Sequence, residues 1–223
     1  MLSLTAFLYL TAQAQSTIPS IEPSATYIND DGEETVATSD FAGQAPLSVT
    51  FRANPKNMDD YATIYEWHFQ KEGEETEMMV RYEEDTEYTF TESGTIVVTL
   101  KAKVSQDSEE LPTNPIRVTV SESKLSFPNA FSPNGDDKNP TFKAKEYQSI
   151  VEFHAYIFNR WGQKLYEWTD PAGEWDGTYN GKVVKDGTYF LLVKAKGADG
   201  RKYNIRKDVN VLTGYTEGNR LND

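Results

Sequence analysis

Hydrophobic and polar residues alternate along most of the chain, in short stretches that turn residues separate. A period of two places successive side chains on opposite faces of a β-strand, so each stretch predicts a half-buried strand. No stretch keeps a helical period over three turns, and Gly, Asn, Asp and Pro fill the intervals. The sequence predicts an all-β protein built from two antiparallel β-sandwiches in series. The clearest alternating stretches are residues 47–51, 65–69, 96–104, 116–120, 151–157, 189–193 and 209–211.

Charge divides the chain into two parts. Residues 17–123 carry 22 acidic and 7 basic side chains, whereas residues 124–223 carry 13 acidic and 15 basic ones. This change predicts a boundary between a first domain at 17–123 and a second domain that begins at 124, with a protease-sensitive linker at 121–124. Residues 216–223 extend beyond the last predicted strand as a tail, so the second domain spans 124–215. The net charge of −13 argues against nucleic acid as a partner, because phosphate binding needs a positive surface. The absence of cysteine excludes disulfides, thiolate catalysis and thiolate metal sites.

Residues 1–14 predict a signal peptide. An apolar run from Leu2 to Leu10 precedes Ala12-Gln13-Ala14, the small-x-small pattern after which signal peptidase cleaves. The run is far shorter than the ~20 residues of a membrane-spanning helix. The usual positive n-region is missing, since no Lys or Arg precedes Arg52. We expect cleavage after Ala14 and an exported protein without a transmembrane segment. The alternative is a cytoplasmic chain with a hydrophobic N-terminus.

Three segments of the first domain carry a resemblance to a known family. They are "AGQAPLSVTF", "YEWHF" and "YTFTESGTIVVTLKA", within residues 20–120. They resemble the PKD-type domain, an immunoglobulin-like sandwich, and the resemblance implies that Trp67 is the core tryptophan. The chain departs from the family at the turn after this strand, where it reads Gln70-Lys71-Glu72-Gly73. PKD-type modules are generally spacers or adhesion modules, so the resemblance implies no chemistry.

The second domain carries three motifs in order, "FPNAFSPNGDDKNPTF", "IFNRWGQKLYEW" and "EWDGTYNGKVVKDGTYFLLVKA". Together they resemble the gliding-motility-associated C-terminal domain, the type B sorting domain of type IX secretion. The resemblance implies a compact β-sandwich that outer-membrane secretion machinery recognises and that leaves its bearer on or outside the cell surface. It implies no catalysis. The motif positions are Phe127, Pro128, Asn134, Gly135, Asp136, Asn159, Arg160, Trp161, Gly162, Trp175, Asp176, Gly177, Gly187 and Tyr189.

The tryptophans of these motifs lie next to predicted hairpin corners. Asn159 and Gly162 of "NRWG" suit a tight turn, and "WDGTYNG" contains an Asp-Gly and an Asn-Gly pair that favour positive backbone dihedrals. We expect Trp161, Trp168 and Trp175 to close the ends of a small sandwich, because aromatic residues at hairpin ends usually complete a core. In the alternative, they face a partner or a sugar.

The loop "SPNGDDKNP" has two interpretations. Asn134, Asp136, Asp137 and Asn139 supply oxygen atoms around a glycine bend, as a calcium loop does. The loop lacks the spaced carboxylates and the distant bidentate Glu of an EF-hand, and a lysine and a proline interrupt its ligands. We expect a self-bonded loop of Asx turns that covers the start of the sandwich, with no metal or other cofactor. Calcium is the alternative.

One basic ribbon contrasts with the acidic chain. In "VKAKGADGRKYNIRK", alternation places four cationic side chains on one face of a hairpin that turns at residues 197–200. In the simplest interpretation the ribbon is a solvated strand face. Its charge also suits an anionic partner, either a protein loop or a surface polysaccharide. The four residues are Lys194, Lys196, Lys202 and Arg206.

No arrangement of residues predicts catalysis. His68 and His154 are isolated on strands, and a carboxylate pair such as Glu174 and Asp176 needs a deep cleft that small sandwiches rarely offer. We predict a non-enzymatic exported protein of the cell surface or outer membrane that acts through protein–protein association. It is either a type IX secretion substrate or an accessory subunit of an outer-membrane complex, with an outer-membrane or secretion-machinery protein as partner. The alternative is a glycan-binding or adhesion module that uses two or three coplanar surface aromatics.

Overall fold

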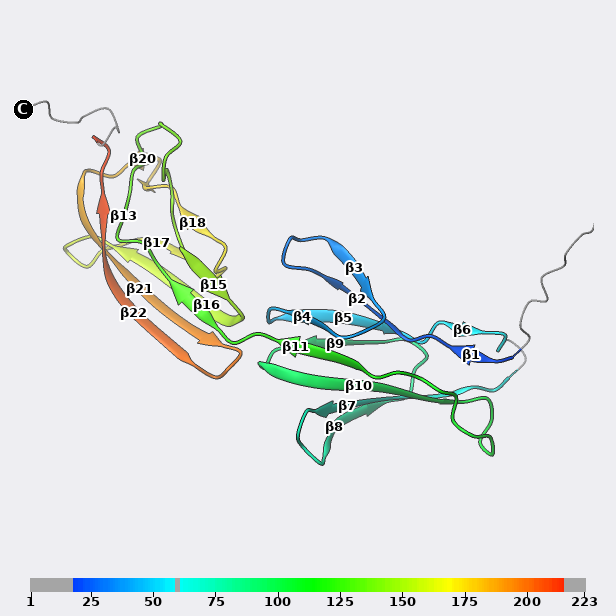
Figure 1. The fold of residues 1–223 in the computed structure, drawn as a ribbon. Coiled ribbons are helices and arrows are strands. Elements are labelled where there is room, and N and C mark those ends of the chain that lie inside the picture. The colour runs from blue at the N-terminus through cyan, green and yellow to red at the C-terminus, as the bar shows by residue number, and fades with distance from the viewer. Residues whose placement is uncertain (1–17, 59–60, 215–223) are drawn as a thin grey trace, which may run out of the picture.

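A computed structural model describes residues 18–58 and 61–214, and the predicted signal peptide and C-terminal tail lie outside these residues. The described chain consists of strands and turns, with no helix. Residues 20–120 form a first domain and residues 124–211 a second, and Figure 1 shows the two domains end to end. The prediction of an all-β protein with β-sandwich domains in series is confirmed. None of the described segments is a helix long and apolar enough to cross a membrane.

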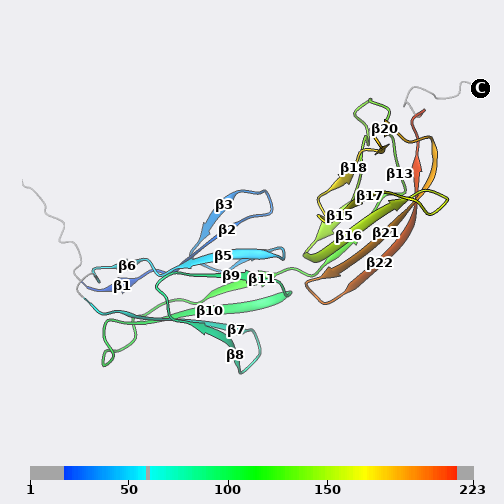
Figure 2. The same cartoon turned by 180° about the vertical axis from the view of Figure 1, so that it is seen from behind.

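The first domain consists of two packed sheets and a short strand pair. Its strands are β1 (Ser20–Ile21), β2 (Ser24–Ile28), β3 (Glu34–Ala37), β4 (Phe41–Gly43), β5 (Leu47–Arg52), β6 (Pro55–Lys56), β7 (Ile64–Lys71), β8 (Glu77–Arg81), β9 (Thr86–Phe90), β10 (Gly94–Lys103) and β11 (Ile116–Val120). One sheet has five strands in the order β4-β11-β10-β7-β8, and the other has four in the order β3-β2-β5-β9. Strands β1 and β6 pair at the end farther from the second domain (Figure 2).

The core of the first domain is centred on Trp67. Its side chain is 1% exposed, and Phe51 and Phe69 beside it are fully buried. The rings of Phe51 and Phe69 meet edge-on, with centroids 5.6 Å apart. The Trp67 indole N–H donates to the carbonyl of Glu84 at 3.1 Å, which satisfies its polar edge. The PKD-type resemblance implied this core position for Trp67.

The second domain has one extended sheet and three short strand pairs. Its strands are β12 (Lys124–Ser126), β13 (Ala130–Phe131), β14 (Phe142–Lys143), β15 (Glu146–Gln148), β16 (Ile150–Phe158), β17 (Lys164–Trp168), β18 (Glu174–Trp175), β19 (Thr178–Tyr179), β20 (Lys182–Val183), β21 (Gly187–Gly197) and β22 (Lys202–Val211). The main sheet has five strands in the order β13-β22-β21-β16-β17. The pairs β12-β15, β14-β18 and β19-β20 supply the second layer.

Alternation along β16, β21 and β22 separates an inner from an outer face of this sheet. Ala155, Ile157 and Val193 point inward and are fully buried, whereas their sequence neighbours are half-buried or exposed. Most ladders in the chain are antiparallel, as predicted. Each main sheet also contains one parallel pair, β4 with β11 and β13 with β22.

The two domains share a packed boundary. Ala198, in the turn between β21 and β22, belongs to the core cluster of the first domain, and Val151 packs against that cluster. The Ser93 N–H donates to the Ala198 carbonyl at 3.1 Å. In the linker itself Ser123 is only 2% exposed. This packing argues against the protease-sensitive linker expected from charge alone.

Candidate functional site

The first motif of the second domain builds part of its core. Phe127 and Phe131 pack on Phe142, with ring centroids 5.9 and 5.8 Å away. The Ser132 N–H donates to the carbonyl of Asn139 at 2.8 Å and closes the loop between them. The phenylalanines therefore anchor a loop whose polar tip is left at the surface.

The tip of this loop bonds to itself, as predicted. The Asp136 N–H donates to Asn134 Oδ1 at 3.1 Å, and Asn134 Nδ2 donates to Asp136 Oδ2 at 2.8 Å. The bond from Asn134, with a second from the backbone N–H of Lys138, holds the pKa of the Asp136 carboxyl below its usual value. Gly135 and Asp137 take positive φ angles of 80° and 60° in these turns. Within the described residues, no group of three His, Cys, Asp or Glu is placed to hold a metal ion.

Trp175 of the third motif packs on the first-motif loop. Its side chain is fully buried, with its ring 5.3 Å from that of Phe131 and 5.8 Å from that of Tyr189. Its indole N–H donates to the carbonyl of Thr178 at 2.9 Å. Trp168 is also buried, at 7% exposure. The prediction that these two tryptophans complete the core is confirmed.

The turn residues of the third motif fix the strands around Trp175. Asp176 Oδ1 accepts bonds from the N–H and hydroxyl of Thr178 at 2.8 and 2.7 Å. Gly177 has a φ of 79°, and a Cβ there would lie 2.9 Å from Cγ of Pro133. The Tyr189 hydroxyl donates to the carbonyl of Lys185 at 2.8 Å. These motif residues therefore stabilise the fold of the second domain.

The second motif forms the hairpin tip between β16 and β17. Asn159 Oδ1 accepts the backbone N–H groups of Trp161 and Gln163, both at 3.0 Å. Gly162, with a φ of 79°, donates its N–H to the Asn159 carbonyl at 3.0 Å. The Gln163 side chain reaches the hydroxyl of Tyr179 at 2.9 Å. The polar groups of the tip therefore hold its shape from within.

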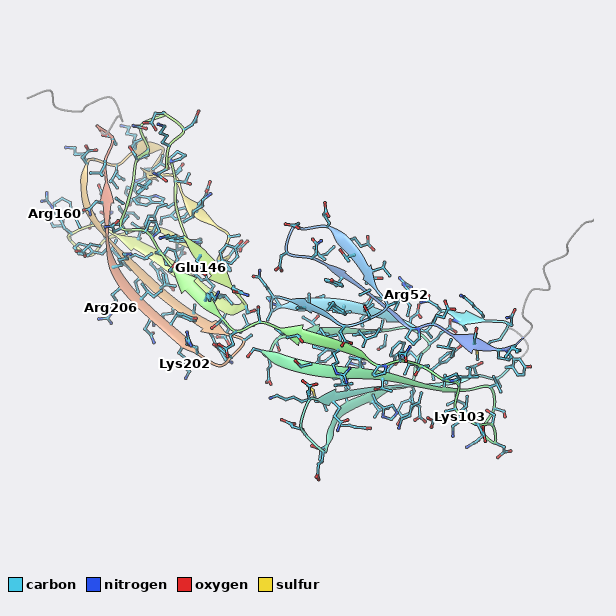
Figure 3. All side chains as sticks on the ribbon, in the orientation of Figure 1. Arg52, Lys103, Glu146, Arg160, Lys202 and Arg206 are labelled. Carbon is cyan, nitrogen blue, oxygen red and sulfur yellow. The ribbon has the colours of Figure 1, made fainter. Side chains whose placement is uncertain are left out.

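Trp161 lies outside the core, so the prediction that it closes the sandwich is wrong. Its side chain is 76% exposed, the largest value among the big hydrophobic residues that the structure describes. Its ring contacts the Arg160 guanidinium, whose Cζ lies 4.5 Å from the ring centroid. The physical reason is that Trp161 lies in the turn that the bonds of Asn159 hold, and this turn projects past the sheet, where Figure 3 labels Arg160.

The basic ribbon has the geometry that alternation predicts. Lys196 pairs with Lys202, Lys194 with Asn204 and Leu192 with Arg206 across β21 and β22, so all four cations share the outer face. They are exposed, and Figure 3 shows Arg206 and Lys202 along the outer side of the sheet, below Arg160. Lys196 Nζ lies 3.6 Å from Oε1 of Glu152 on β16 and forms an ion pair with it. Among the described residues, no ion-pair partner lies within reach of Lys194, Lys202 or Arg206.

An aromatic row lies beside the ribbon, and sequence reasoning missed it. His154, Tyr156 and Phe158 point outward from β16 at successive alternate positions. The His154 and Tyr156 rings stack at 4.2 Å and 23°, and the Tyr156 and Phe158 rings are 6.1 Å apart at 32°. Phe158 pairs with Phe190 of β21, which is 40% exposed. The signal was the nearly unbroken apolar run "FHAYIF", which places hydrophobic groups on both faces of one strand.

Together these groups make a mixed aromatic and basic surface, which we call the outer face: the aromatic row of His154, Tyr156, Phe158 and Phe190 and the ribbon of Lys194, Lys196, Lys202 and Arg206. An open depression of about 790 Å³ adjoins Phe158, Phe190 and Arg206. At the β17 edge of the outer face, Lys164 Nζ donates to Glu167 Oε2 at 2.7 Å. This bond holds the pKa of the Glu167 carboxyl below its usual value. The outer face offers stacking and cationic contacts to a partner.

The candidate catalytic groups hold structural positions. Glu174 accepts a bond from the Thr141 hydroxyl at 2.8 Å, and Asp176 caps its own turn. On β7, His68 Nδ1 lies 2.8 Å from Glu77 Oε1, and His68 Nε2 lies 3.3 Å from Glu66 Oε2. None of these groups forms a pair across a cleft in the described chain.

Comparison with known proteins agrees with the second-domain motifs. Residues 125–208 match the family model described as the CHU_C type IX secretion signal domain. The match indicates a type IX secretion-related protein of the cell surface. No curated protein matches the chain.

Solved structures of tandem β-domains are similar to the chain in part. The chicken CNTN1 FN1-FN3 domains are 10% identical, with a TM-score of 0.32 over 77% of this chain, which spans 62% of that structure's length. A tetra-tandem repeat from the extending region of a large adhesion protein is 10% identical, with a TM-score of 0.30 over 88% of this chain and 68% of the other. DIP-gamma IG1+IG2 is 8% identical, with a TM-score of 0.24 over 85% and 96%.

Proposed function

We propose that this chain is a non-enzymatic exported protein that works through protein–protein association at the outer membrane. Its signal peptide, residues 1–14, directs export across the inner membrane. Its second domain is the part that the secretion machinery or another outer-membrane protein recognises, and its first domain is a PKD-type spacer or binding module. The protein is either a type IX substrate of the type B class or an accessory subunit of an outer-membrane complex.

The match of residues 125–208 to the type IX secretion signal domain is the observation that carries this proposal. The structure supports it from a second direction, because the same domain presents the outer face. A cationic face on a chain with a net charge of −13 suits an acidic partner, since complementary charge guides association.

Deletion of the type IX outer-membrane channel in the producing bacterium tests the proposed route. We expect the full chain, processed after Ala14, to accumulate in the periplasm of this strain and to become resistant to protease added outside the cells. The same amount of protease-accessible chain on cells with and without the channel would contradict the type IX substrate and leave the accessory subunit. N-terminal sequencing of the periplasmic pool checks the cleavage site in the same material.

A second candidate function is glycan binding, which the aromatic row favours. Sugars stack on flat rings, and Tyr156 and Phe158 present two neighbouring rings, whose planes are inclined to each other by 32°, on an open face. Surface polysaccharide would then bind along β16, with the cations beside it contacting acidic sugars. Calorimetric titration with polysaccharide from the producing cells separates the candidates. Binding that Tyr156→Ala abolishes would favour the glycan, whereas the absence of heat would favour a protein partner.

A further inference from the structure

We propose that Arg160 and Trp161 form an anchor that inserts into a pocket of the protein partner, with apolar walls and carboxylates at the rim. We call this pair the hairpin anchor. The inference rests on the association proposed above and names the group that gives it affinity. It assigns a binding task to a tip that contributes no side chain to the core of the domain.

Exposure is the first observation. The other three tryptophans of the chain, Trp67, Trp168 and Trp175, are at most 7% exposed, whereas Trp161 is 76% exposed. A tryptophan gains more from burial than almost any other side chain, and here the fold leaves that gain unused. Tryptophan and arginine are also the residues that most often dominate the energy of protein interfaces. The tip places the two side by side.

The tip is preorganised, and this is the second observation. Asn159 fixes the backbone of Trp161 and Gln163 through two side-chain bonds at 3.0 Å, and Gln163 is tied to Tyr179 of the next hairpin. The guanidinium of Arg160 lies over the indole at 4.5 Å. A rigid anchor loses little conformational entropy on binding, so more of its contact energy is retained as affinity.

Charge identifies the chemistry of the pocket. The Arg160 guanidinium lies on the face of the indole. When the ring enters the pocket, the guanidinium therefore enters with it or stops at the rim. Lys182 is exposed on the neighbouring hairpin, where it is the cross-strand partner of Tyr179. A pocket that accepts the indole must therefore neutralise cations at its entrance, which carboxylates do. One ring does not make the coplanar platform that sugars use, so the geometry favours a protein.

The experiment uses the full mature chain and outer-membrane vesicles from the producing bacterium as the probe. Because Trp161 is the exposed tryptophan, an aqueous quencher such as acrylamide reaches it and spares the three buried rings. On binding to vesicles we expect a blue-shifted emission and a loss of the quenchable fraction. Vesicles treated with protease, and liposomes of the extracted lipids, should give neither change.

Two variants and a matched control test the roles. Trp161→Ala should weaken vesicle binding about tenfold or more, as hot-spot truncation does. Arg160→Gln should weaken it by about threefold and reduce its salt dependence, because it removes one cation. Tyr82→Ala should leave binding unchanged, since Tyr82 is 69% exposed but lies in the first domain. Equal melting temperatures would show that each variant remains folded.

Photo-crosslinking then locates the pocket. With p-benzoylphenylalanine in place of Trp161, we expect a crosslink to one vesicle protein, mapped to a peptide that combines apolar and acidic residues. A crosslink to a second copy of this chain, or to lipid alone, would overturn the anchor. If Trp161→Ala binds the vesicles as strongly as the unchanged chain does, the hairpin anchor is overturned and the proposed association stands. If the unchanged chain does not bind the vesicles, both the anchor and the association are overturned.

Discussion

The hydroxyl groups of Ser121 and Ser149 lie 2.8 Å apart across the boundary between the two domains. Ser149 is 2% exposed, takes a positive φ of 46°, and also accepts the backbone N–H of Ala45 in the first domain at 3.2 Å. One side chain thus joins the first domain, the linker and the start of the second sheet. We infer that the two domains hold a defined relative orientation, so the first domain sets where the outer face and the hairpin anchor point.

We predict that this boundary resists proteolysis and that Gly197→Ala opens it. A Cβ at Gly197 would collide with the side chain of Ser123, so the linker must move. Overpacking of this kind destabilises by ~1–3 kcal/mol. Limited proteolysis of the wild type should leave residues 121–124 intact, and the variant should be cut there. Gly214→Ala is the control, because a Cβ at that site meets only Asp186 Oδ2, at 3.9 Å.

We predict that the boundary weakens in acid through Asp199. The hydrogen bond from the Ser123 hydroxyl at 2.7 Å, with a second from the Arg201 N–H, holds the pKa of Asp199 below its usual value. A lowered folded pKa means that the carboxylate stabilises the fold above its unfolded pKa of about 4, and that this contribution is lost as the pH falls through the folded value.

Urea unfolding of the wild type and of Asp199→Asn at pH 7 and pH 3 measures this effect. The stability difference between the two proteins should be largest at pH 7 and should shrink toward pH 3. A difference that is the same at both pH values would show that the carboxylate charge contributes nothing at the boundary.

We predict opposite outcomes for two tryptophans of neighbouring motifs. Trp175→Ala removes a fully buried ring and should lower the free energy of unfolding by ~3–5 kcal/mol. Trp161→Ala removes an exposed ring and should change it by only ~0.5 kcal/mol. Denaturant unfolding of the two variants makes the comparison. Similar losses for both would mean that the tip carries core contacts.

We predict that calcium leaves the protein unchanged. The oxygens of Asn134 and Asp136 already bond one another in the loop, so a cation would have to break those bonds to gain ligands. The melting temperature should be the same in millimolar calcium and in a chelator. A rise with calcium that Asp136→Asn removes would establish the calcium loop instead.

Period-two alternation was enough to predict the longer strands and the basic ribbon, whereas the short strand pairs of both domains carried no such signal. Residues two apart on one strand share a face, and a hairpin turn at residues 197–200 sets the register between β21 and β22, so Lys194 and Arg206 could be placed together without coordinates. The same argument missed the aromatic row because β16 is apolar on both faces. A continuous hydrophobic run does not indicate which of its residues point into the core.

The position of Trp161 and the domain boundary depended on contacts that pattern does not contain. Sequence indicates a turn at "NRWG", but it does not say whether the indole of Trp161 faces the core or the solvent, and the structure leaves this side chain exposed. Ser149 and Ala45 meet although 104 positions separate them, and no local signal marks such a pair. Both features depend on how segments are placed relative to one another in three dimensions, whereas the sequence pattern indicates only which strand or turn each segment forms.

Reversal of the unpaired cations of the outer face tests the central claim, that the second domain acts through association. The measurement is retention of the full chain on the surface of the producing cells, at low and at high salt. The test variant carries Lys194→Glu, Lys202→Glu and Arg206→Glu, and its control carries Lys124→Glu, Lys143→Glu and Lys145→Glu on the other layer of the domain.

All six residues are exposed, so both variants should fold, with ~0.5 kcal/mol of stability at stake for each substitution. The control also breaks the ion pairs of Lys124 with Glu146 and of Lys143 with Glu174, and exposed pairs of this kind contribute little to stability. We predict that the test variant loses most of its retention at low salt and loses the salt dependence of what remains, because complementary charge no longer speeds its association. The control should be retained like the wild type. Retention of the test variant at the wild-type level, at both salt concentrations, would contradict the account and leave the outer face as a solvated surface.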